Sequence, residues 1–271
     1  MHTYNGGENT ISYRDDLNPS RNQDVVFNVS GPKKGRGMVI MLHGYSSSKE
    51  SGLYREFDGE FNEVGITTCR MSYFGHGKAY GDWNGYGATP DVTLTKAYDS
   101  LDLMIRLVQE KGEENIVLLG SSFGGLLAMR GAACHKDIKG LVLKSAVIEP
   151  KRFWRQRIRN NERGIRSIAH WQKEGVLDFK FGVEDYKLDF EFWRDIYEHD
   201  TLAEARNISC PTMIIHGEDD TSIPLEQSEH ISRITNEPIS IVPGADHAYS
   251  GEEQQKAMKK LIFDFVSGVL E

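Results

Sequence analysis

The sequence lacks long apolar segments and has fewer basic than acidic residues, and each shortage excludes a class of protein. No run of about 18 apolar residues occurs in the 271 residues, so no membrane-spanning helix is expected. Residues 1–8 do not show the basic and then apolar pattern of a secretory signal. The 32 basic residues face 40 acidic ones, and this net charge of −8 argues against a general affinity for nucleic acid or anionic membranes. We therefore expect a cytoplasmic protein with no nucleic-acid partner.

Cysteine is scarce, with only Cys69, Cys134 and Cys210 in the chain. Their number is odd and none forms a Cys-x-x-Cys pair, so they predict neither a disulfide framework nor a zinc site. We expect all three to be reduced thiols in the core. The consecutive carboxylates of residues 218–220 do not favour a metal, because neighbours on one loop seldom converge on one ion. No glycine-rich phosphate-binding pattern occurs, so no metal or cofactor is predicted.

Short apolar runs recur along the chain, and each ends at a turn signal. Helical patterns separate most of them, as in residues 94–110, where apolar side chains recur three and four positions apart. Strands that alternate with helices form a mainly parallel sheet covered by helices on both faces, so we predict an α/β fold. Functional residues in such a fold gather at the carboxyl ends of the strands. The predicted strands are residues 10–13, 25–29, 37–42, 66–71, 115–119, 138–147, 212–215 and 239–242.

The alternation stops at about residue 148, where polar, aromatic-rich sequence of helical character replaces the next strand. We therefore predict a core domain of residues 1–147 and 208–271 with an inserted cap of residues 148–207. Residues 151–166 carry seven basic side chains against the single acid Glu162, whereas residues 184–200 are acidic. Two interpretations stay open: the two halves neutralise each other, or the basic half attracts anions to an entrance.

The pentapeptide Gly-Ser-Ser-Phe-Gly at residues 120–124 carries the strongest chemical signal. It follows an apolar run and opens a helix-like stretch, so Ser122 is predicted to lie on a tight turn between a strand and a helix. Gly120 and Gly124 suit such a turn because a Cβ atom there would clash with the backbone and the packed helix. This pattern indicates a nucleophile elbow; the alternative is a serine that caps the helix.

A serine nucleophile needs a base and an acid that orients the base, and candidates for both lie downstream. Asp220 follows the strand of residues 212–215, and His247 follows the strand of residues 239–242. Asp220 is preferred to Asp219 because of its spacing to Pro224. The order Ser, Asp, His and the strand-end positions predict a catalytic triad. The alternative for His247 is an ordinary loop histidine.

Acyl transfer also requires donors for the oxyanion of the tetrahedral intermediate. The backbone N–H of Tyr45 follows the strand of residues 37–42 and is predicted to face the elbow. The N–H of Phe123, directly after the nucleophile, is the second predicted donor. His43 is expected to brace this loop.

These motifs resemble the α/β-hydrolase superfamily from about residue 37 to residue 269. They are His43-Gly44, the elbow, His216-Gly217-x-x-Asp220-x-x-Ile223-Pro224 and Gly244-x-Asp246-His247. The chain is most similar to capped serine esterases and serine-aminopeptidase-like hydrolases, a group that includes cinnamoyl and feruloyl esterases. The resemblance implies Ser122 as nucleophile, His247 as base, Asp220 as orienting acid, and Tyr45 and Phe123 as oxyanion donors. The chain departs from many relatives at Ala79, where they have a serine after Gly-His-Gly.

The expected function is a carboxylesterase that cleaves small to medium acyl or aryl esters without a cofactor. Trp154 and Trp171, two of the cap aromatics, are candidate substrate contacts. Peptidase or thioesterase activity is the alternative reaction, and a ligand-binding receptor on the same fold is the alternative class. Exposed cap aromatics would also suit a homodimer.

Overall fold

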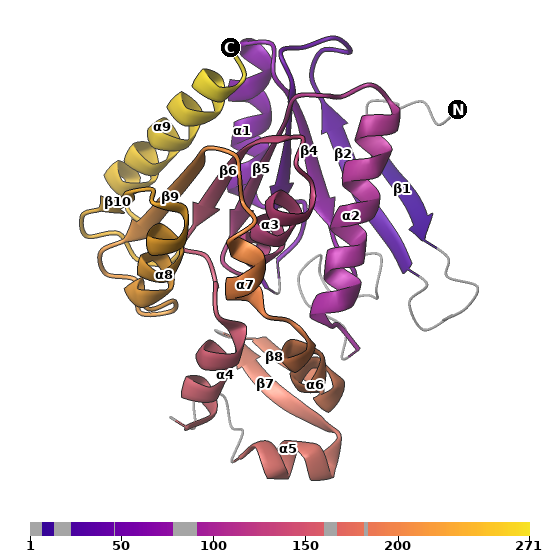
Figure 1. Ribbon diagram of the computed structural model, residues 1–271, viewed down its shortest axis with the longest axis vertical. Helices are drawn as coiled ribbons and strands as arrows, with labels where there is room; N and C mark the ends of the chain where they lie inside the picture. Colours follow the sequence, from indigo (N-terminus) through magenta and orange to yellow (C-terminus); the bar gives the residue numbers. More distant parts are fainter. Residues whose placement is uncertain (1–6, 14–22, 46, 78–90, 160–166, 182–183) are drawn as a thin grey trace.

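The computed structural model describes residues 7–13, 23–45, 47–77, 91–159, 167–181 and 184–271. Its main sheet has the strand order β1-β2-β4-β3-β5-β6-β9-β10 within these residues (Figure 1). The strands are β1 (Gly7–Tyr13), β2 (Gln23–Ser30), β3 (Met38–Leu42), β4 (Thr67–Ser72), β5 (Ile116–Ser121), β6 (Ile138–Lys144), β9 (Thr212–Gly217) and β10 (Ile239–Val242).

The sheet is mainly parallel, which confirms the predicted fold class. All strands from β4 to β10 in the sheet order run parallel to their neighbours, whereas β1 and β2 form an antiparallel edge against β4. All five residues of β3 are buried. A central parallel strand is covered on both faces, and this is why its sequence is a continuous apolar run and not an alternating one.

Helices cover both faces of the sheet. Apolar residues of α1 (Gly52–Glu63) and α9 (Glu252–Val269) pack in one core cluster, and those of α2 (Leu94–Glu110), α3 (Phe123–Cys134) and α8 (Leu225–Thr235) pack in the other. The periodic apolar face of α2 is buried, and Thr93 caps its first turn by accepting a hydrogen bond from the Lys96 N–H. No helix in the described part of the chain is both long and apolar enough to cross a membrane.

The chain leaves the sheet after β6 and returns at β9. The intervening elements are α4 (Pro150–Arg159), α5 (Ile168–Glu174), β7 (Val176–Phe181), β8 (Glu184–Asp189), α6 (Phe190–Glu198) and α7 (Thr201–Ala205). Most of them lie beyond the carboxyl ends of the strands, whereas the last of them, α7, packs against α3 and α8 (Figure 1). The helical interpretation of this segment is wrong for β7 and β8, which pair as an antiparallel hairpin. The alternating apolar positions of residues 176–181 are a strand signal that the sequence analysis missed.

A polar network joins α6 to the helices of the core. The Thr95 hydroxyl donates to Asp195 Oδ1 at 2.5 Å, and the Thr95 N–H donates to Asp195 Oδ2 at 3.0 Å. His199 Nε2 lies 3.0 Å from the same hydroxyl and 3.6 Å from Asp195 Oδ2. Arg130 of α3 forms an ion pair with Glu204 at 2.7 Å, and Glu204 lies 3.9 Å from His199 Nδ1. The core helices α2 and α3 therefore anchor this part of the chain, α2 through Thr95 to Asp195 of α6 and α3 through Arg130 to Glu204 of α7.

The expectation that all three cysteines are core thiols is wrong. All are free, but only Cys69 is buried; Cys210 is partly exposed and Cys134 is exposed. Cys69 lies on β4 between two layers of helices, and burial raises the pKa of its thiol to about 12. Cys134 is the last residue of α3, where the helix reaches the surface.

Candidate active site

Ser122 occupies the turn between β5 and α3 in a strained backbone conformation. Its φ of 56° and ψ of −117° lie in a region that non-glycine residues rarely adopt, at a cost of about 1–3 kcal/mol. The Ser122 N–H donates to the carbonyl of Lys144 at 3.0 Å, and the Ser122 carbonyl accepts from the N–H of Val147 at 3.0 Å. These two bonds to the chain after β6 hold the turn in place.

The two glycines of the elbow are required by close backbone contacts. A Cβ atom on Gly124 would lie 2.1 Å from the carbonyl oxygen of Leu42, and one on Gly120 would lie 2.3 Å from the carbonyl oxygen of Gly124. Any larger side chain would push β3, β5 and α3 apart. The glycines thus permit the close packing on which the position of Ser122 at the cavity depends.

Asp220 lies after β9 in a hydrogen-bonded position that excludes water. Its carboxylate is fully buried, Oδ1 accepts from the N–H groups of Ser222 and Ile223 at 2.8 and 2.9 Å, and Oδ2 accepts from His247 Nδ1 at 2.7 Å. Burial is the largest single influence and would raise the pKa of Asp220, but the hydrogen bond and charge of His247, the Ile223 N–H and the charge of His216 together outweigh it and hold the pKa below its usual range. Asp219 is exposed, and the structure places no contact between its side chain and His247.

His216 braces the loop that carries this carboxylate. Its Nε2 donates to the Ile223 carbonyl at 3.0 Å, and its Nδ1 accepts from the Ser228 hydroxyl at 2.8 Å. Burial lowers the pKa of His216, so the ring is neutral and both nitrogens are used. Within the described residues, no group of three or more His, Cys, Asp or Glu side chains is arranged to hold a metal ion.

His247 and Ser122 face the same small cavity of about 50 Å³. The His247 ring is 29% exposed and turns its Nδ1 to Asp220, so that Nε2 is left for the cavity. No hydrogen bond joins the Ser122 hydroxyl to His247 among the described residues. The fold therefore brings the three predicted triad residues to one site, with the aspartate and histidine in direct contact and the serine across the cavity.

The predicted oxyanion donors lie next to the elbow. Phe123 is the first residue of α3, where backbone N–H groups have no acceptor within the helix and the helix dipole favours an anion. Gly44, just before Tyr45, is so close to the elbow that a Cβ atom on it would lie 3.3 Å from Ser122 Cβ. The Tyr45 ring packs edge-on against Phe123, with 5.5 Å between centroids.

His43 lies behind this loop and not in the cavity. Its ring is buried, stacks on Tyr73 with 4.3 Å between centroids, and donates from Nδ1 to the Gly44 carbonyl at 2.8 Å. The Tyr73 hydroxyl donates to the His43 carbonyl at 2.8 Å. Burial lowers the pKa of His43, so it stays neutral. The neighbouring departure at Ala79 lies outside the described residues.

One face of α4 forms a wall of the cavity. Pro150, Phe153, Trp154 and Arg157 line it, at the three- and four-residue spacing of a single helical face. Trp154 is thus placed where the sequence analysis expected a substrate contact. Phe153 and Arg157 were missed as cavity residues, although their spacing from Trp154 and Pro150 was a readable signal.

Trp171 does not line the cavity, and its assignment as a substrate contact is wrong. Its side chain is fully buried within the inserted segment, and its indole N–H donates to the Leu188 carbonyl at 3.0 Å. The ring packs edge-on against Phe190 and tilted against Trp193. The tryptophan is therefore the centre of the small core that α5 and α6 build.

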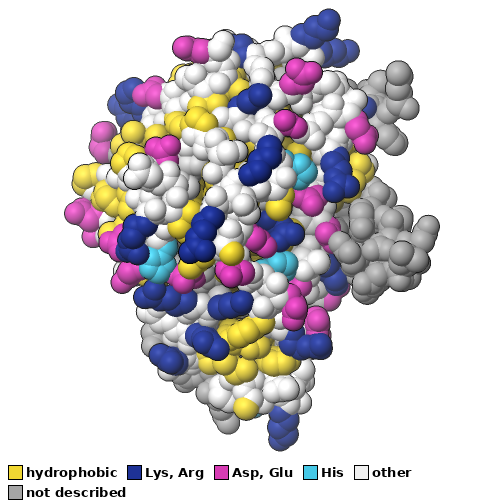
Figure 2. Space-filling model, viewed as in Figure 1, with side chains coloured by type: hydrophobic (Ala, Val, Ile, Leu, Met, Phe, Trp, Pro, Cys, Tyr) yellow, Lys and Arg dark blue, Asp and Glu magenta, His cyan; other side chains and the backbone are white. Residues whose placement is uncertain are grey.

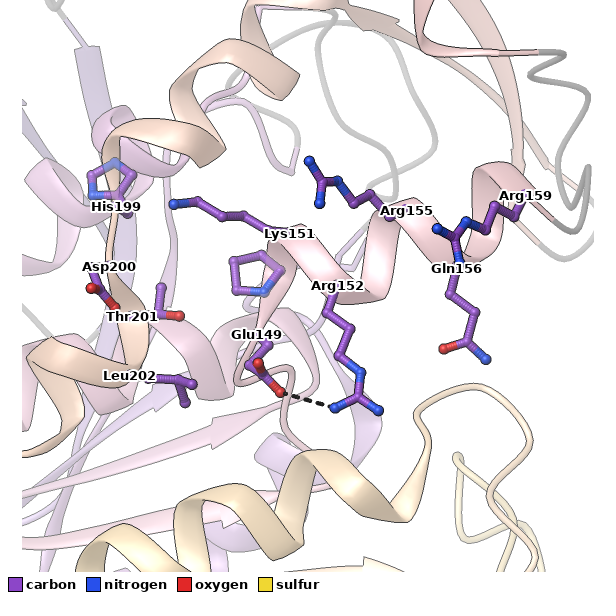
Figure 3. A pocket seen from close by; sticks show the side chains of 11 residues that line it. Glu149, Lys151, Arg152, Arg155, Gln156, Arg159, His199, Asp200, Thr201 and Leu202 are labelled. Atoms are coloured by element: carbon purple, nitrogen blue, oxygen red, sulfur yellow. Dashed lines mark ion pairs between the residues drawn. The ribbon is translucent and has the colours of Figure 1, made fainter.

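The opposite face of α4 lines a second, larger cavity of about 670 Å³ (Figure 3). Arg152 reaches Glu149 at 3.7 Å, whereas Lys151 and Arg155 lie over the Tyr197 ring, at 5.3 and 5.4 Å from its centroid. Figure 2 shows Lys and Arg side chains around hydrophobic ones on this lower part of the molecule. Among the described side chains, no ion pair links α4 to the acidic half, so direct mutual neutralisation is not observed there.

Comparisons with known proteins agree with this fold. A model of the alpha/beta hydrolase family matches residues 39–258. The chain is 24% identical over 276 residues to a putative esterase/lipase 2 of Mycoplasma genitalium, covering 92% of this chain and 96% of that protein. It is 22% identical over 278 residues to the proline iminopeptidase PfmaB of Pestalotiopsis fici, covering 88% and 94%. The structure of Est1E from Butyrivibrio proteoclasticus with bound ferulic acid has a TM-score of 0.75 and 22% identity, covering 91% of this chain and 96% of that one.

Proposed function

Because the chain belongs to the α/β-hydrolase family, we propose that it is a serine esterase that cleaves carboxylic esters with Ser122 as the nucleophile. The observation that carries the proposal is the 2.7 Å bond between Asp220 and His247 at the rim of the cavity that Ser122 also lines. A histidine that donates from one ring nitrogen to a buried carboxylate and faces a cavity with the other is suited to transfer a proton. The strained Ser122 turn adds a hydroxyl presented toward the same space.

In the proposed acylation step, His247 Nε2 takes the proton of the Ser122 hydroxyl as the oxygen attacks the ester carbonyl carbon. The tetrahedral intermediate collapses, the C–O bond to the alcohol breaks, and the imidazolium gives its proton to the leaving alkoxide. Water, deprotonated by His247, then attacks the acyl carbon; the bond to the Ser122 oxygen breaks, the imidazolium returns its proton to that oxygen, and the acid is released. Asp220 orients the ring and stabilises the imidazolium in both steps.

The negative charge of the intermediate is proposed to lie between the N–H groups of Tyr45 and Phe123. Backbone donors that are already held in place lose little free energy by reorganisation when the charge develops. The start of α3 adds the positive end of the helix dipole. This arrangement supports acyl transfer of any kind, so the choice of esters depends on the rest of the cavity.

The residues of the cavity wall favour a substrate with a small to medium acyl or aryl group. Phe153 and Trp154 present aromatic surface, and the Arg157 guanidinium packs over the Phe153 ring at 4.5 Å and donates to the Ser222 carbonyl. The ferulic acid bound to Est1E is an aryl acid, which fits a wall of this chemistry. In this proposal the inserted segment of residues 148–207 is a cap that selects the acyl group.

A peptidase is the second candidate, and the similarity to a proline iminopeptidase favours it. The same triad cleaves amides, so the leaving group distinguishes the two reactions. The deciding experiment measures hydrolysis of p-nitrophenyl acyl esters of increasing length alongside matched aminoacyl anilides.

The panel is run with the wild type, Ser122→Ala and a control variant, Ser232→Ala, which removes a serine hydroxyl of α8 that donates to the Glu237 carbonyl and does not line the cavity. We expect turnover of esters that is lost in Ser122→Ala and kept in Ser232→Ala. Cleavage of the anilides at a comparable rate would favour the peptidase. If no turnover of either panel depended on Ser122, the esterase proposal would be wrong and a ligand-binding role would take its place.

A further inference from the structure

Lys144 is a buried cation directly beneath the proposed triad. It is the last residue of β6 and pairs with Ser121, the neighbour of the nucleophile on β5. The residue is only 4% exposed, and no carboxylate oxygen lies within ion-pair distance of its ammonium group among the described residues. Burial of a charge without an ion-pair partner lowers the free energy of unfolding. The position of Lys144 therefore calls for an explanation other than stability.

The ammonium group of Lys144 connects the two chain segments that carry the nucleophile and the base. Its Nζ donates to the backbone carbonyl of His247 itself at 3.2 Å and to the Ser121 hydroxyl at 3.4 Å. It also lies 4.2 Å from the centroid of the Tyr249 ring, two residues after His247, as a cation–π contact. The Lys144 side chain thus contacts Ser121 beside the elbow and both His247 and Tyr249 in the loop after β10.

The histidine loop needs such an anchor because its backbone is strained and β10 ends before it. Tyr249 has a φ of 56°, and its hydroxyl meets that of Ser145 at 3.3 Å. Ser145, next to Lys144, has a φ of 43° and donates its N–H to the Ile215 carbonyl at 2.8 Å. The loop after β10 therefore packs against the end of β6.

We propose that Lys144 is a positioning residue that sets the distance between the Ser122 elbow and the His247 imidazole by holding the His247 carbonyl and the Ser121 hydroxyl together. The inference rests on the proposed serine-esterase function. A displacement of about 1 Å between nucleophile and base is enough to slow acyl transfer about 100-fold, so an anchor that spans both segments acts on the rate.

The charge of Lys144 also acts on the site through the groups that face it. Those groups are Asp220 and His216 from β9 and its loop, and Asp246, His247 and Tyr249 from the loop after β10. Burial lowers the pKa of Lys144 to about 8, against the opposing pull of Asp220 and Asp246. The ammonium group of Lys144 therefore loses its proton as the pH rises through about 8, and the contacts that depend on its charge weaken there.

The test uses Lys144→Met, which keeps the length of the side chain and removes the ammonium group. Lys139→Met is the matched control, because Lys139 lies on the same strand and is exposed. The second-order rate of labelling by a fluorophosphonate probe, which reacts with an activated serine, is measured from pH 5 to 10 alongside ester hydrolysis.

We expect Lys144→Met to lower kcat/KM about 100-fold, mainly through kcat, and to remove the decline in rate that deprotonation of Lys144 causes in the wild type above about pH 8. Lys144→Arg, which restores charge and donors, should recover part of the rate. Lys139→Met should match the wild type. If Lys144→Met is not folded by circular dichroism, Lys144→Gln, which keeps a donor without the charge, replaces it under the same expectation.

The outcomes separate the two proposals. If the wild type is not labelled, or if Ser122→Ala is labelled equally, the esterase proposal fails. If labelling depends on Ser122 but the Lys144 variants react at the wild-type rate with an unchanged pH profile, only the positioning role is overturned. A lower unfolding temperature with unchanged kcat and an unchanged pH profile would likewise reduce Lys144 to a structural residue.

Discussion

Two of the aspartate–histidine pairs in the described part of the molecule lie in different surroundings. In the first, Asp220 and His247 meet at 2.7 Å at the edge of the small cavity. In the second, Asp195 and His199 lie 3.6 Å apart between α6 and the core helix α2. The first pair shares its cavity with a strained serine, whereas the second is enclosed by Thr95, Arg130 and Glu204.

The two pairs differ in whether a ring nitrogen of the histidine remains available to a further partner. Both ring nitrogens of His199 lie near acceptors in the contact between α6, α7 and the core helices. Nε2 lies near Thr95 and Asp195, and Nδ1 lies near Glu204. Burial alone would lower the pKa of His199, but the hydrogen bonds to Asp195 and Glu204 outweigh it and raise the pKa to about 9. This histidine is a fixed cation at neutral pH. His247 has one nitrogen directed away from its aspartate, and this free nitrogen is what proton transfer requires.

The largest effect is expected from Asp220→Asn. The asparagine no longer fixes the tautomer of His247 or stabilises its imidazolium, so kcat should fall on the order of 10⁴-fold. Hydrolysis of a p-nitrophenyl ester measures the rate, and circular dichroism checks that the fold is kept. A loss of less than about tenfold in a folded variant would contradict the assignment of Asp220.

The corresponding change in the second pair, Asp195→Asn, should act on stability and not on chemistry. It removes a charge that accepts from Thr95 and His199, so the free energy of unfolding should fall by about 2–3 kcal/mol. Urea unfolding measures this loss, and the ester assay on the folded variant should show a change of less than about tenfold. A 10⁴-fold loss of kcat here would show that the two pairs are not functionally distinct.

The raised pKa of His199 predicts a pH dependence of stability. A group whose pKa is higher in the folded state stabilises fully below the unfolded pKa, here the ordinary value of 6.5, and loses this contribution as the pH rises through about 9. Between these pH values the free energy of unfolding should fall on the order of 1 kcal/mol more in the wild type than in His199→Gln. Parallel urea titrations of the two proteins test the prediction, and identical slopes against pH would refute it.

The smallest effect is expected from Asp219→Asn, next to the proposed triad acid. Asp219 is exposed and its side chain makes no contact with His247, so kcat should stay within about twofold of the wild type. The same ester assay provides the measurement. Should Asp219→Asn be the damaging change and Asp220→Asn the mild one, the two carboxylates must exchange roles.

Local sequence signals were sufficient for most of the core fold. The apolar runs of β3 and β5 and the periodic face of α2 predicted their elements because burial on both faces or on one face leaves a direct trace in sequence. The hairpin of β7 and β8 was missed although its apolar positions alternate, because each strand has only six residues and helical patterns surround it. Trp171 was assigned to the substrate because composition marks a tryptophan as apolar but does not say which core it joins.

The sequence by itself determined the parallel α/β sheet, the turn at Ser122 with its glycines, and the placement of Asp220 and His247 at strand ends, since each depends on residues close together in the chain. Only the tertiary structure decided which face of α4 lines the cavity, that Asp220 and not Asp219 meets His247, and that Lys144 reaches the His247 loop. Lys144 and His247 are 103 residues apart. Contacts over such separations depend on how strands and loops assemble, and no local pattern records them.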